Sequence, residues 1–320
     1  MNTLIYWVAM TCNKLTVDML DTVVISLLTS LCVTLIAIPL IRQYAIRLHL
    51  TDNPTGDALK IHKNPIPFVG GIGMLAGLTS GLLIANPQHT GPLVLVICIS
   101  LAFGLLDDLF LHHRSSTSLA AKILSQLFLG GICVFLLNRA NLLPENIPTL
   151  AIGFAFLFVV NATNLNDGLD GLLSGIALIS GIGFLFAFSH LGMRDGALLS
   201  AMLIGITAGF LAFNLPPASI FMGDNGSYLL GALFSILGIL LINTQGSSAI
   251  LGTLCIIGMP ILNACFVSVR RIAAGQSPLV GDRLHLYDMI GQRTGNLHAT
   301  LFINYCIHGI LVITGVSLLT

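Results

Sequence analysis

Acidic side chains end several apolar runs of this chain, and their spacing suggests chemistry. Asp107 and Asp108 are adjacent in GLLDDLF, and Asp167 and Asp170 stand three residues apart in NLNDGLDG. Two neighbouring carboxylates repel each other, which raises the pKa of one of them unless a cation compensates. The adjacent pair therefore fits a general base or a ligand of a divalent metal beside a diphosphate, with a solvated helix cap as the structural alternative.

An amide and a further carboxylate extend this set. Asn164 precedes Asp167 by three residues, so a helical turn would place both on one face with Asp170. Asp224 lies in FMGDNGS, a turn before another apolar run. Because Mg²⁺ takes a few hard oxygen ligands and completes its shell with water and substrate phosphates, these residues predict a Mg²⁺–diphosphate site, with Mn²⁺ as the alternative metal. Phe221, in the same loop, is predicted from its chemistry alone to be a membrane anchor.

Basic side chains gather in two segments and at one isolated position. They are Lys60, His62 and Lys63 in a stiff Pro-containing loop, Arg270, Arg271, Arg283 and His285 further along, and Lys122 just inside an apolar run. Binding of phosphate at the level of the lipid headgroups is one interpretation. Simple anchoring of the loops at the membrane surface, or snorkelling in the case of Lys122, is the other, and the residue types leave both open.

The composition makes the lipid bilayer the solvent of this chain. Of 320 residues, 55% are hydrophobic. Only 8% are charged, whereas a soluble domain carries ~25%. The formal net charge is zero, so no nucleic-acid partner follows from charge. The predicted fold class is all-α, a polytopic integral membrane protein with about ten transmembrane helices in a single domain over residues 1–320.

Ten apolar runs are predicted to be membrane spans, and the residues before 22 fit either an interfacial segment or an extra crossing. The spans are 22–46, 68–85, 91–106, 119–137, 148–162, 172–190, 197–213, 228–243, 248–269 and 297–318. Gly73, Gly77 and Gly81 recur every four residues in the second span, which predicts close packing against a neighbouring helix.

The distribution of basic residues predicts the orientation of these spans. Alternation assigns ten basic residues to one set of connections (Arg42, Arg47, Lys60, Lys63, Arg114, Lys122, Arg270, Arg271, Arg283 and Arg293) and three to the other (Lys14, Arg139 and Arg194). The first set is therefore predicted to face the cytoplasm, with the amino terminus outside. The same alternation brings all the polar clusters named above to the cytoplasmic side, which predicts one shared active site there.

Several of these segments together resemble a known family. KIHKNPIPFVGG, GLLDDL, NATNLNDGLDGLLSG, FNLPPASIFMGDNGS and RRIAAGQSPLVGDRLH follow one another between Asp52 and His285. In type and order they are similar to the polyprenyl-phosphate N-acetylhexosamine-1-phosphate transferases of glycosyltransferase family 4. That family includes undecaprenyl-phosphate GlcNAc-1-phosphate transferases and the phospho-MurNAc-pentapeptide transferase. The resemblance implies a bacterial inner-membrane enzyme that uses Mg²⁺, a UDP-N-acetyl amino sugar and undecaprenyl phosphate and releases UMP, with a homodimer as an open alternative to a monomer.

The resemblance also implies roles for individual residues. Asn164 and Asp224 would hold the metal, Asp170 would contact the uracil with Asp167 nearby, and Phe221 would stack on the base, contrary to the anchor role favoured above. Asp107 would deprotonate or orient the lipid phosphate. The remaining residues would bind phosphate, diphosphate or sugar: Asp108 and Lys122 near the phosphates, Lys60 and His62 at the lipid phosphate, and Arg270, Arg283 and His285 at the sugar and diphosphate.

Three places depart from the family pattern, and one of them, HLYD, lies in the loop that the resemblance associates with sugar recognition. Leu111 occupies a place where a third Asp is frequent, Asn263 stands where Asp is common, and the histidine-rich stretch reads HLYD, with Tyr287 and Asp288. We therefore hypothesise that HLYD reshapes the sugar pocket. We expect GlcNAc-1-phosphate or a related amino sugar as the transferred group, with phospho-MurNAc-pentapeptide transfer as the alternative. A secondary transporter and a non-catalytic membrane scaffold are the alternatives from other classes.

Overall fold

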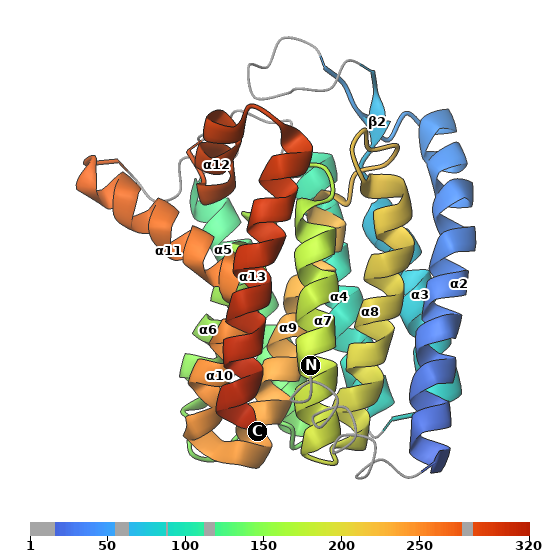
Figure 1. Ribbon diagram of the computed structural model, residues 1–320, viewed down its shortest axis with the longest axis vertical. Coiled ribbons are helices and arrows are strands. Elements are labelled where there is room, and N and C mark those ends of the chain that lie inside the picture. Colours follow the sequence, from blue (N-terminus) through green and yellow to red (C-terminus); the bar gives the residue numbers. More distant parts are fainter. Residues whose placement is uncertain (1–16, 55–63, 88, 112–118, 277–283) are drawn as a thin grey trace.

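The computed structural model describes residues 17–54, 64–87, 89–111, 119–276 and 284–320, without the side chains of residues 17–18, 110–111 and 119–122. These residues form an almost entirely helical bundle (Figure 1). The helices are α2 (Val17–Arg47), α3 (Gly70–Ala85), α4 (Thr90–Leu106), α5 (Leu119–Arg139), α6 (Thr149–Asn164), α7 (Leu172–His190), α8 (Arg194–Asn214), α9 (Gly223–Gln245), α10 (Ala249–Ile256), α11 (Gly258–Ala273), α12 (Leu286–Thr294) and α13 (Leu297–Leu319). The shorter elements are the π-helical turn η1 (Asp107–Leu111), the 3₁₀ turn η2 (Gly246–Ser248) and a two-stranded antiparallel hairpin of β1 (Thr51–Asp52) and β2 (Ile66–Pro67).

The predicted polytopic all-α fold is confirmed. Six helical segments among the described residues are long and apolar enough to cross a membrane: Met19–Arg47, Thr90–Leu109, Leu172–His190, Arg194–Asn214, Gly223–Ile256 and Leu297–Leu319. Three shorter apolar helices accompany them: Gly70–Ala85, Ile123–Arg139 and Thr149–Asn164. Gly223–Ile256 includes a chain reversal, because Gly246 adopts φ 74° after α9 and α10 then runs back.

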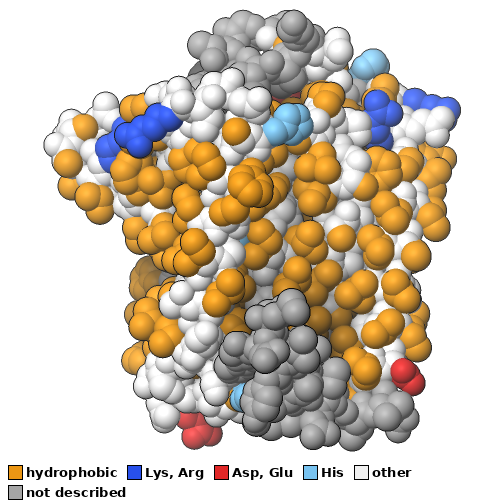
Figure 2. Space-filling view, viewed as in Figure 1, with side chains coloured by type: hydrophobic (Ala, Val, Ile, Leu, Met, Phe, Trp, Pro, Cys, Tyr) orange, Lys and Arg blue, Asp and Glu red, His pale blue; other side chains and the backbone are white. Residues whose placement is uncertain are grey.

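Burial separates central from peripheral helices. The apolar stretches of α7 and α8 are each 72% buried, whereas those of α2 and α13 are 22% and 28% buried. Hydrophobic side chains cover much of the face shown in Figure 2. Many Leu, Ile and Phe side chains of the bundle are exposed. Backbone polar groups in a bilayer must be satisfied inside the helix, and apolar side chains there need no burial in protein. The peripheral helices are therefore the lipid-facing ones.

Small residues allow α3 to approach α2 closely, as the glycine spacing predicts. A Cβ atom at Gly77 or Gly81 would collide with Thr34 or Ser30 of α2, which leaves no space for larger side chains. The α2–α3 contact therefore depends on glycine at these positions.

The predicted ninth span, 248–269, is wrong as one continuous helix, because it is broken between α10 and α11 at Ile257. Pro260 has no N–H to donate to the carbonyl of Ile256, so a regular helix cannot continue through this position. The hydroxyl of Ser180 in α7 donates to that carbonyl instead, at 2.8 Å. After the break α11 leans away from the bundle (Figure 1) and carries Arg270 and Arg271 at its far end.

The two ends of the bundle differ in composition. We call the end where α4, α6 and α11 finish, and where α12 and β2 lie, the site face (Figure 1). The opposite end, with residues 86–87, 140–148, 191–193 and 246–248, is the far face. The Lys and Arg side chains visible in Figure 2 lie near the site face. All the polar clusters of the sequence whose residues are described belong to the site face.

Candidate active site

Asp108 joins the end of α4 to the start of α9. Its carboxylate accepts the backbone N–H of Asp224 at 2.9 Å and of Asn225 at 3.0 Å, and the side-chain amide of Asn225 at 2.7 Å. A carboxylate at a helix N-terminus satisfies free N–H groups and complements the positive end of the helix dipole. Asp108, in the π-helical turn, therefore caps a helix more than one hundred residues away in the sequence and fixes the position of Asp224.

The two predicted metal ligands lie in direct contact. The side-chain nitrogen of Asn164, the last residue of α6, is 2.6 Å from Oδ1 of Asp224 in the first turn of α9 and 2.9 Å from the hydroxyl of Ser227. Both Asn164 and Asp224 are partly buried. The fold thus brings together an amide and a carboxylate that are sixty residues apart in the sequence.

Asp107 lies in a buried polar network that sequence reasoning did not identify. It is 8% exposed, and the hydroxyl of Tyr228 in α9 donates to its Oδ2 at 3.2 Å. Beside them, Gln126 of α5 donates to Asn161 of α6 at 2.7 Å. The signal available in the sequence was a glutamine within an apolar span and a tyrosine one turn after Asp224. Tyr228 thus links Asp107 of η1 to α9, and Gln126 links α5 to α6 beside them.

Asp167 lies in a region of concentrated negative charge at the candidate active site. Burial raises its pKa well above the usual value, and the charges of Asp224, Asp108 and Asp170 raise it further. A carboxyl group surrounded by three others is easier to ionise when a cation binds among them. The arrangement therefore favours cation binding.

The oxygen ligands available at this site fit Mg²⁺ better than a metal ion whose ligands all come from the protein. Among the described residues, no group of three His, Cys, Asp or Glu side chains is placed to hold a metal ion. Mg²⁺ is commonly bound through one or two carboxylates and completes its shell with water and substrate phosphates. Asn164 and Asp224, both with oxygen donors, suit such an open site.

The predicted nucleotide residues lie in two connected loops. Oδ2 of Asp170 accepts the N–H of Ala218 at 2.9 Å, so the loop after α6 is tied to the loop before α9. Phe221, partly buried, is held through its backbone: its N–H donates to Pro67 at 2.7 Å and its carbonyl accepts from Gly70 at 3.0 Å. The hairpin strand β2 and the start of α3 thus support the loop that carries Phe221.

The HLYD segment docks on the loop after α6. The ring of Tyr287, 4% exposed, stacks on that of His285 with centroids 5.0 Å apart, and its hydroxyl donates to the carbonyl of Leu165 at 3.3 Å. The tyrosine ring occupies the space in which a Cβ atom at Gly168 would lie. Oδ2 of Asp288 accepts the N–H of His285 at 3.2 Å and so caps α12. Tyr287 and Asp288 therefore have structural roles that the sequence hypothesis did not include.

Asn263 completes this junction from α11. Its Oδ1 accepts the N–H of Leu286 at 3.0 Å, and its Nδ2 lies 3.1 Å from the carbonyl of Leu165 and 3.2 Å from Nδ1 of His285. Asn263 is fully buried. One side chain thus joins α11, the loop after α6 and the start of α12.

The remaining predicted site residues are less completely described. Arg271 is buried and Arg270 partly buried at the end of α11, and both have further polar interactions. Lys60, His62 and Arg283 lie outside the described residues, as does the side chain of Lys122, whose backbone is in α5. The predictions for these four residues remain predictions.

Comparison with known proteins identifies relatives of this chain. The glycosyl transferase family 4 model matches residues 91–242. An undecaprenyl-phosphate alpha-N-acetylglucosaminyl 1-phosphate transferase of Yersinia pestis is 30% identical over 266 residues, 78% of this chain and 71% of that protein. A decaprenyl-phosphate N-acetylglucosaminephosphotransferase of Mycobacterium leprae is 30% identical, covering 83% and 76%. A phospho-N-acetylmuramoyl-pentapeptide-transferase of Clostridioides difficile is 33% identical, covering 68% and 74%.

The chain belongs to glycosyl transferase family 4. The predicted family is therefore confirmed, and the protein is a multi-pass membrane member of the polyprenyl-phosphate sugar-1-phosphate transferases. The stretch matched by the family 4 model contains the whole acidic cluster, from Asp107 to Asp224, together with Phe221. Arg270 and His285 lie beyond it.

Proposed function

We propose that this protein transfers GlcNAc-1-phosphate, or the 1-phosphate of a related N-acetylhexosamine, from a UDP-sugar to undecaprenyl phosphate. An oxygen of the lipid phosphate forms a bond to the phosphorus that carries the sugar. The bond from this phosphorus to the bridging oxygen breaks, and UMP leaves. The site face is the cytoplasmic face of a bacterial inner membrane in this proposal, and the product starts the assembly of a cell-envelope glycan.

The observation that carries the proposal is the contact between Asn164 of α6 and Asp224 of α9. Burial and the neighbouring carboxylates, which raise the pKa of Asp167, further support a cation site here. Bound Mg²⁺ would supply charge neutralisation on the diphosphate. Asn164 and Asp224 would hold it, and Asp108 keeps Asp224 in place through the N-terminus of α9. The chemistry of this donor set supports a metal–diphosphate site.

Asp107 is the residue proposed to act on the lipid phosphate. The hydroxyl of Tyr228 donates to it and so limits its orientation. Asp107 would accept the proton of a monoprotonated lipid phosphate or orient the dianion for attack. A direct displacement and a two-step route through an aspartyl intermediate both fit these positions.

The identity of the sugar is proposed from the relatives and from HLYD. Two of the relatives described above carry N-acetylglucosamine in their names, while a third is named for the muramoyl-pentapeptide. Asp288 adds a negative charge near the predicted sugar loop, which disfavours a substrate with peptide carboxylates. A UDP-N-acetylhexosamine is therefore the proposed donor.

The test is an assay of the purified protein with undecaprenyl phosphate, Mg²⁺ and a panel of UDP-N-acetyl sugars that includes UDP-MurNAc-pentapeptide. We expect UMP and a lipid-linked sugar diphosphate from a UDP-N-acetylhexosamine, and loss of both products when Mg²⁺ is chelated. Turnover with the pentapeptide donor alone would overturn the proposed sugar. No turnover with any donor in the panel would favour the scaffold alternative.

A further inference from the structure

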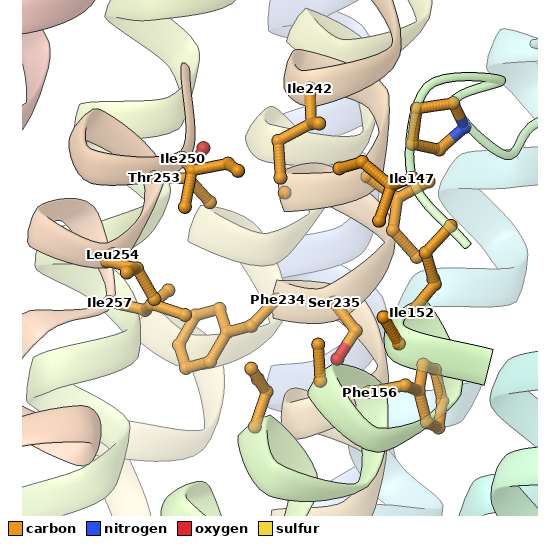
Figure 3. Close-up of a pocket in the computed structure, with 16 residues that line it drawn as sticks. Ile147, Ile152, Phe156, Phe234, Ser235, Ile242, Ile250, Thr253, Leu254 and Ile257 are labelled. Carbon is orange, nitrogen blue, oxygen red and sulfur yellow. The ribbon is translucent and has the colours of Figure 1, made fainter. Parts of the chain in front are cut away.

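An apolar cavity lies away from the candidate active site, between α6, α9 and α10. It has a volume of about 270 Å³ and is lined almost entirely by apolar side chains, including Ile152, Phe156, Phe234 and Leu254 (Figure 3). Its walls come from the first part of α6, the last part of α9 and α10. The cavity therefore lies in the half of the bundle nearer the far face.

A polar pocket of about 560 Å³ adjoins this apolar cavity. The two share Pro144, Ile147 and Ile242 as lining residues. The polar pocket lies at the far face, and its lining includes Asn138, Asn141, Asn146, Asn243 and Glu145. An apolar cavity at membrane depth that continues into a polar pocket at the surface has the shape of a site for an amphiphile.

Thr253 gives a separate indication of a missing ligand. It lines the apolar cavity, is 5% exposed, and its hydroxyl has no hydrogen-bond partner among the described residues. Ser235, on the opposite wall, donates to the carbonyl four residues earlier at 2.8 Å, as do many hydroxyls in these helices. A hydroxyl buried in apolar surroundings without a partner is unfavourable, so an acceptor from a bound molecule would be favourable here.

The depth of Thr253 fits the ester groups of a phospholipid. Thr253 lies four residues after the start of α10, which corresponds to about 6 Å along the helix from the far face. The headgroup and interfacial layer of each leaflet is roughly 5–8 Å thick. A lipid whose headgroup occupied the polar pocket would therefore bring an ester carbonyl close to the level of Thr253.

The charge in the polar pocket indicates which type of phospholipid headgroup would bind there. Glu145 is exposed and, within the part of the chain that the structure describes, is the only charged residue that lines the polar pocket. The primary ammonium of a zwitterionic headgroup can donate hydrogen bonds to the Glu145 carboxylate and to the amide oxygens of the lining asparagines, whereas an anionic headgroup would be repelled by that carboxylate. We propose that the apolar cavity and the polar pocket together form a binding site for a zwitterionic phospholipid with a primary-amine headgroup, taken from the leaflet at the far face.

The test is titration of the delipidated full-length protein with phosphatidylethanolamine or phosphatidylglycerol of identical acyl chains, followed by native mass spectrometry. We expect tighter binding of the ethanolamine lipid, and a preference that Glu145→Gln removes. Ala155→Phe should lower affinity for the ethanolamine lipid by about tenfold. Ala155 is an exposed residue on the cavity wall, so phenylalanine can fill the cavity without repacking the core.

Two further variants keep the outcome interpretable. Leu150→Phe adds an aromatic ring at an exposed position of α6 that does not line the cavity, and it should bind lipid like the wild type. Thr253→Val retains the shape of the side chain and should weaken binding without loss of folding. Unchanged lipid binding in Ala155→Phe would overturn the proposal. The proposal would also be overturned if Ala155→Phe raised the KM for polyprenyl phosphate and left binding of the ethanolamine lipid unchanged. The cavity would then hold the tail of the substrate.

Discussion

The side-chain nitrogen of Asn263 in α11 lies 3.2 Å from Nδ1 of His285, at the start of α12. Oδ1 of the same amide accepts the N–H of Leu286, and because a backbone N–H can only donate, the amide cannot be reversed. Nδ2 must then face Nδ1 of His285, 3.2 Å away, and donate to it. We therefore expect the ring proton of His285 on Nε2, which would make Nε2 a hydrogen-bond donor.

This relationship predicts the effect of Asn263→Asp, the residue common in the family. A carboxylate would accept from Nδ1–H of His285, so the ring would change tautomer or become an imidazolium. We expect Nδ1 of His285 to resonate as a pyridine-type nitrogen in the wild type and as a pyrrole-type nitrogen in the variant, by ¹⁵N NMR of histidine-labelled protein. A His285→Asn variant assigns the signal. Identical spectra for wild type and Asn263→Asp would contradict the tautomer assignment.

The metal role of Asp224 predicts a loss of activity without a loss of stability. Asp224→Asn retains the shape of the side chain and the backbone N–H that donates to Asp108. We expect turnover to fall more than tenfold, about 1.4 kcal/mol in barrier terms, with thermal unfolding close to that of the wild type. Activity above a tenth of the wild-type value at saturating Mg²⁺ would argue against a direct ligand role. Ser227→Ala, which removes the other partner of Asn164, serves as the control.

Asp108 should affect both folding and catalysis because it caps α9. Asp108→Ala removes the acceptor of two backbone N–H groups and of the Asn225 amide, and we expect it to lower the free energy of unfolding by about 1–3 kcal/mol. Asp108→Asn keeps one acceptor oxygen and should recover part of this stability. Denaturant unfolding in detergent measures both. If Asp108→Ala were as stable as the wild type while inactive, the cap would be unimportant and the role purely catalytic.

Asp167 should make stability depend on pH and on the metal. Its folded-state pKa lies above the ordinary value of 3.8, so the folded protein binds more protons than the unfolded chain between these two pKa values. The stability associated with Asp167 is therefore full below the ordinary pKa and is lost as the pH rises through the raised one. We expect Asp167→Asn to gain stability relative to the wild type over this window, by thermal unfolding without metal. Added Mg²⁺ should reduce the difference, and a pH-independent difference would contradict the charge cluster.

The predicted orientation can be tested by accessibility from each side of the membrane. Gln276 follows α11 at the site face, and Thr244 lies at the end of α9 at the far face; both are exposed. In a cysteine-free background, Gln276→Cys should react with a membrane-impermeant thiol reagent only after the inner membrane is opened, whereas Thr244→Cys should react in spheroplasts. Labelling in the reverse order would place the acidic cluster outside the cytoplasm.

The sequence by itself determined the membrane class, the approximate spans and the family, because these depend on local composition and on short motifs. An apolar run of sufficient length is helical in a bilayer whatever its neighbours are, since the backbone has no other way to satisfy its polar groups there. The segments NLNDGLDG and FMGDNGS likewise carry their chemistry in residue type and order. Asn164 and Asp224 could therefore be paired before any contact was known.

Tertiary structure alone decided which polar groups hold one another. The cap that Asp108 forms on α9, the hydroxyl of Tyr228 on Asp107, and the junction of Asn263 with His285 join residues that are distant in the sequence. No local propensity encodes such contacts, because they depend on the packing of several helices at once. The break at Ile257 is of the same kind: Pro260 interrupts the helix, but the hydroxyl of Ser180 from another helix satisfies the carbonyl that the proline leaves free.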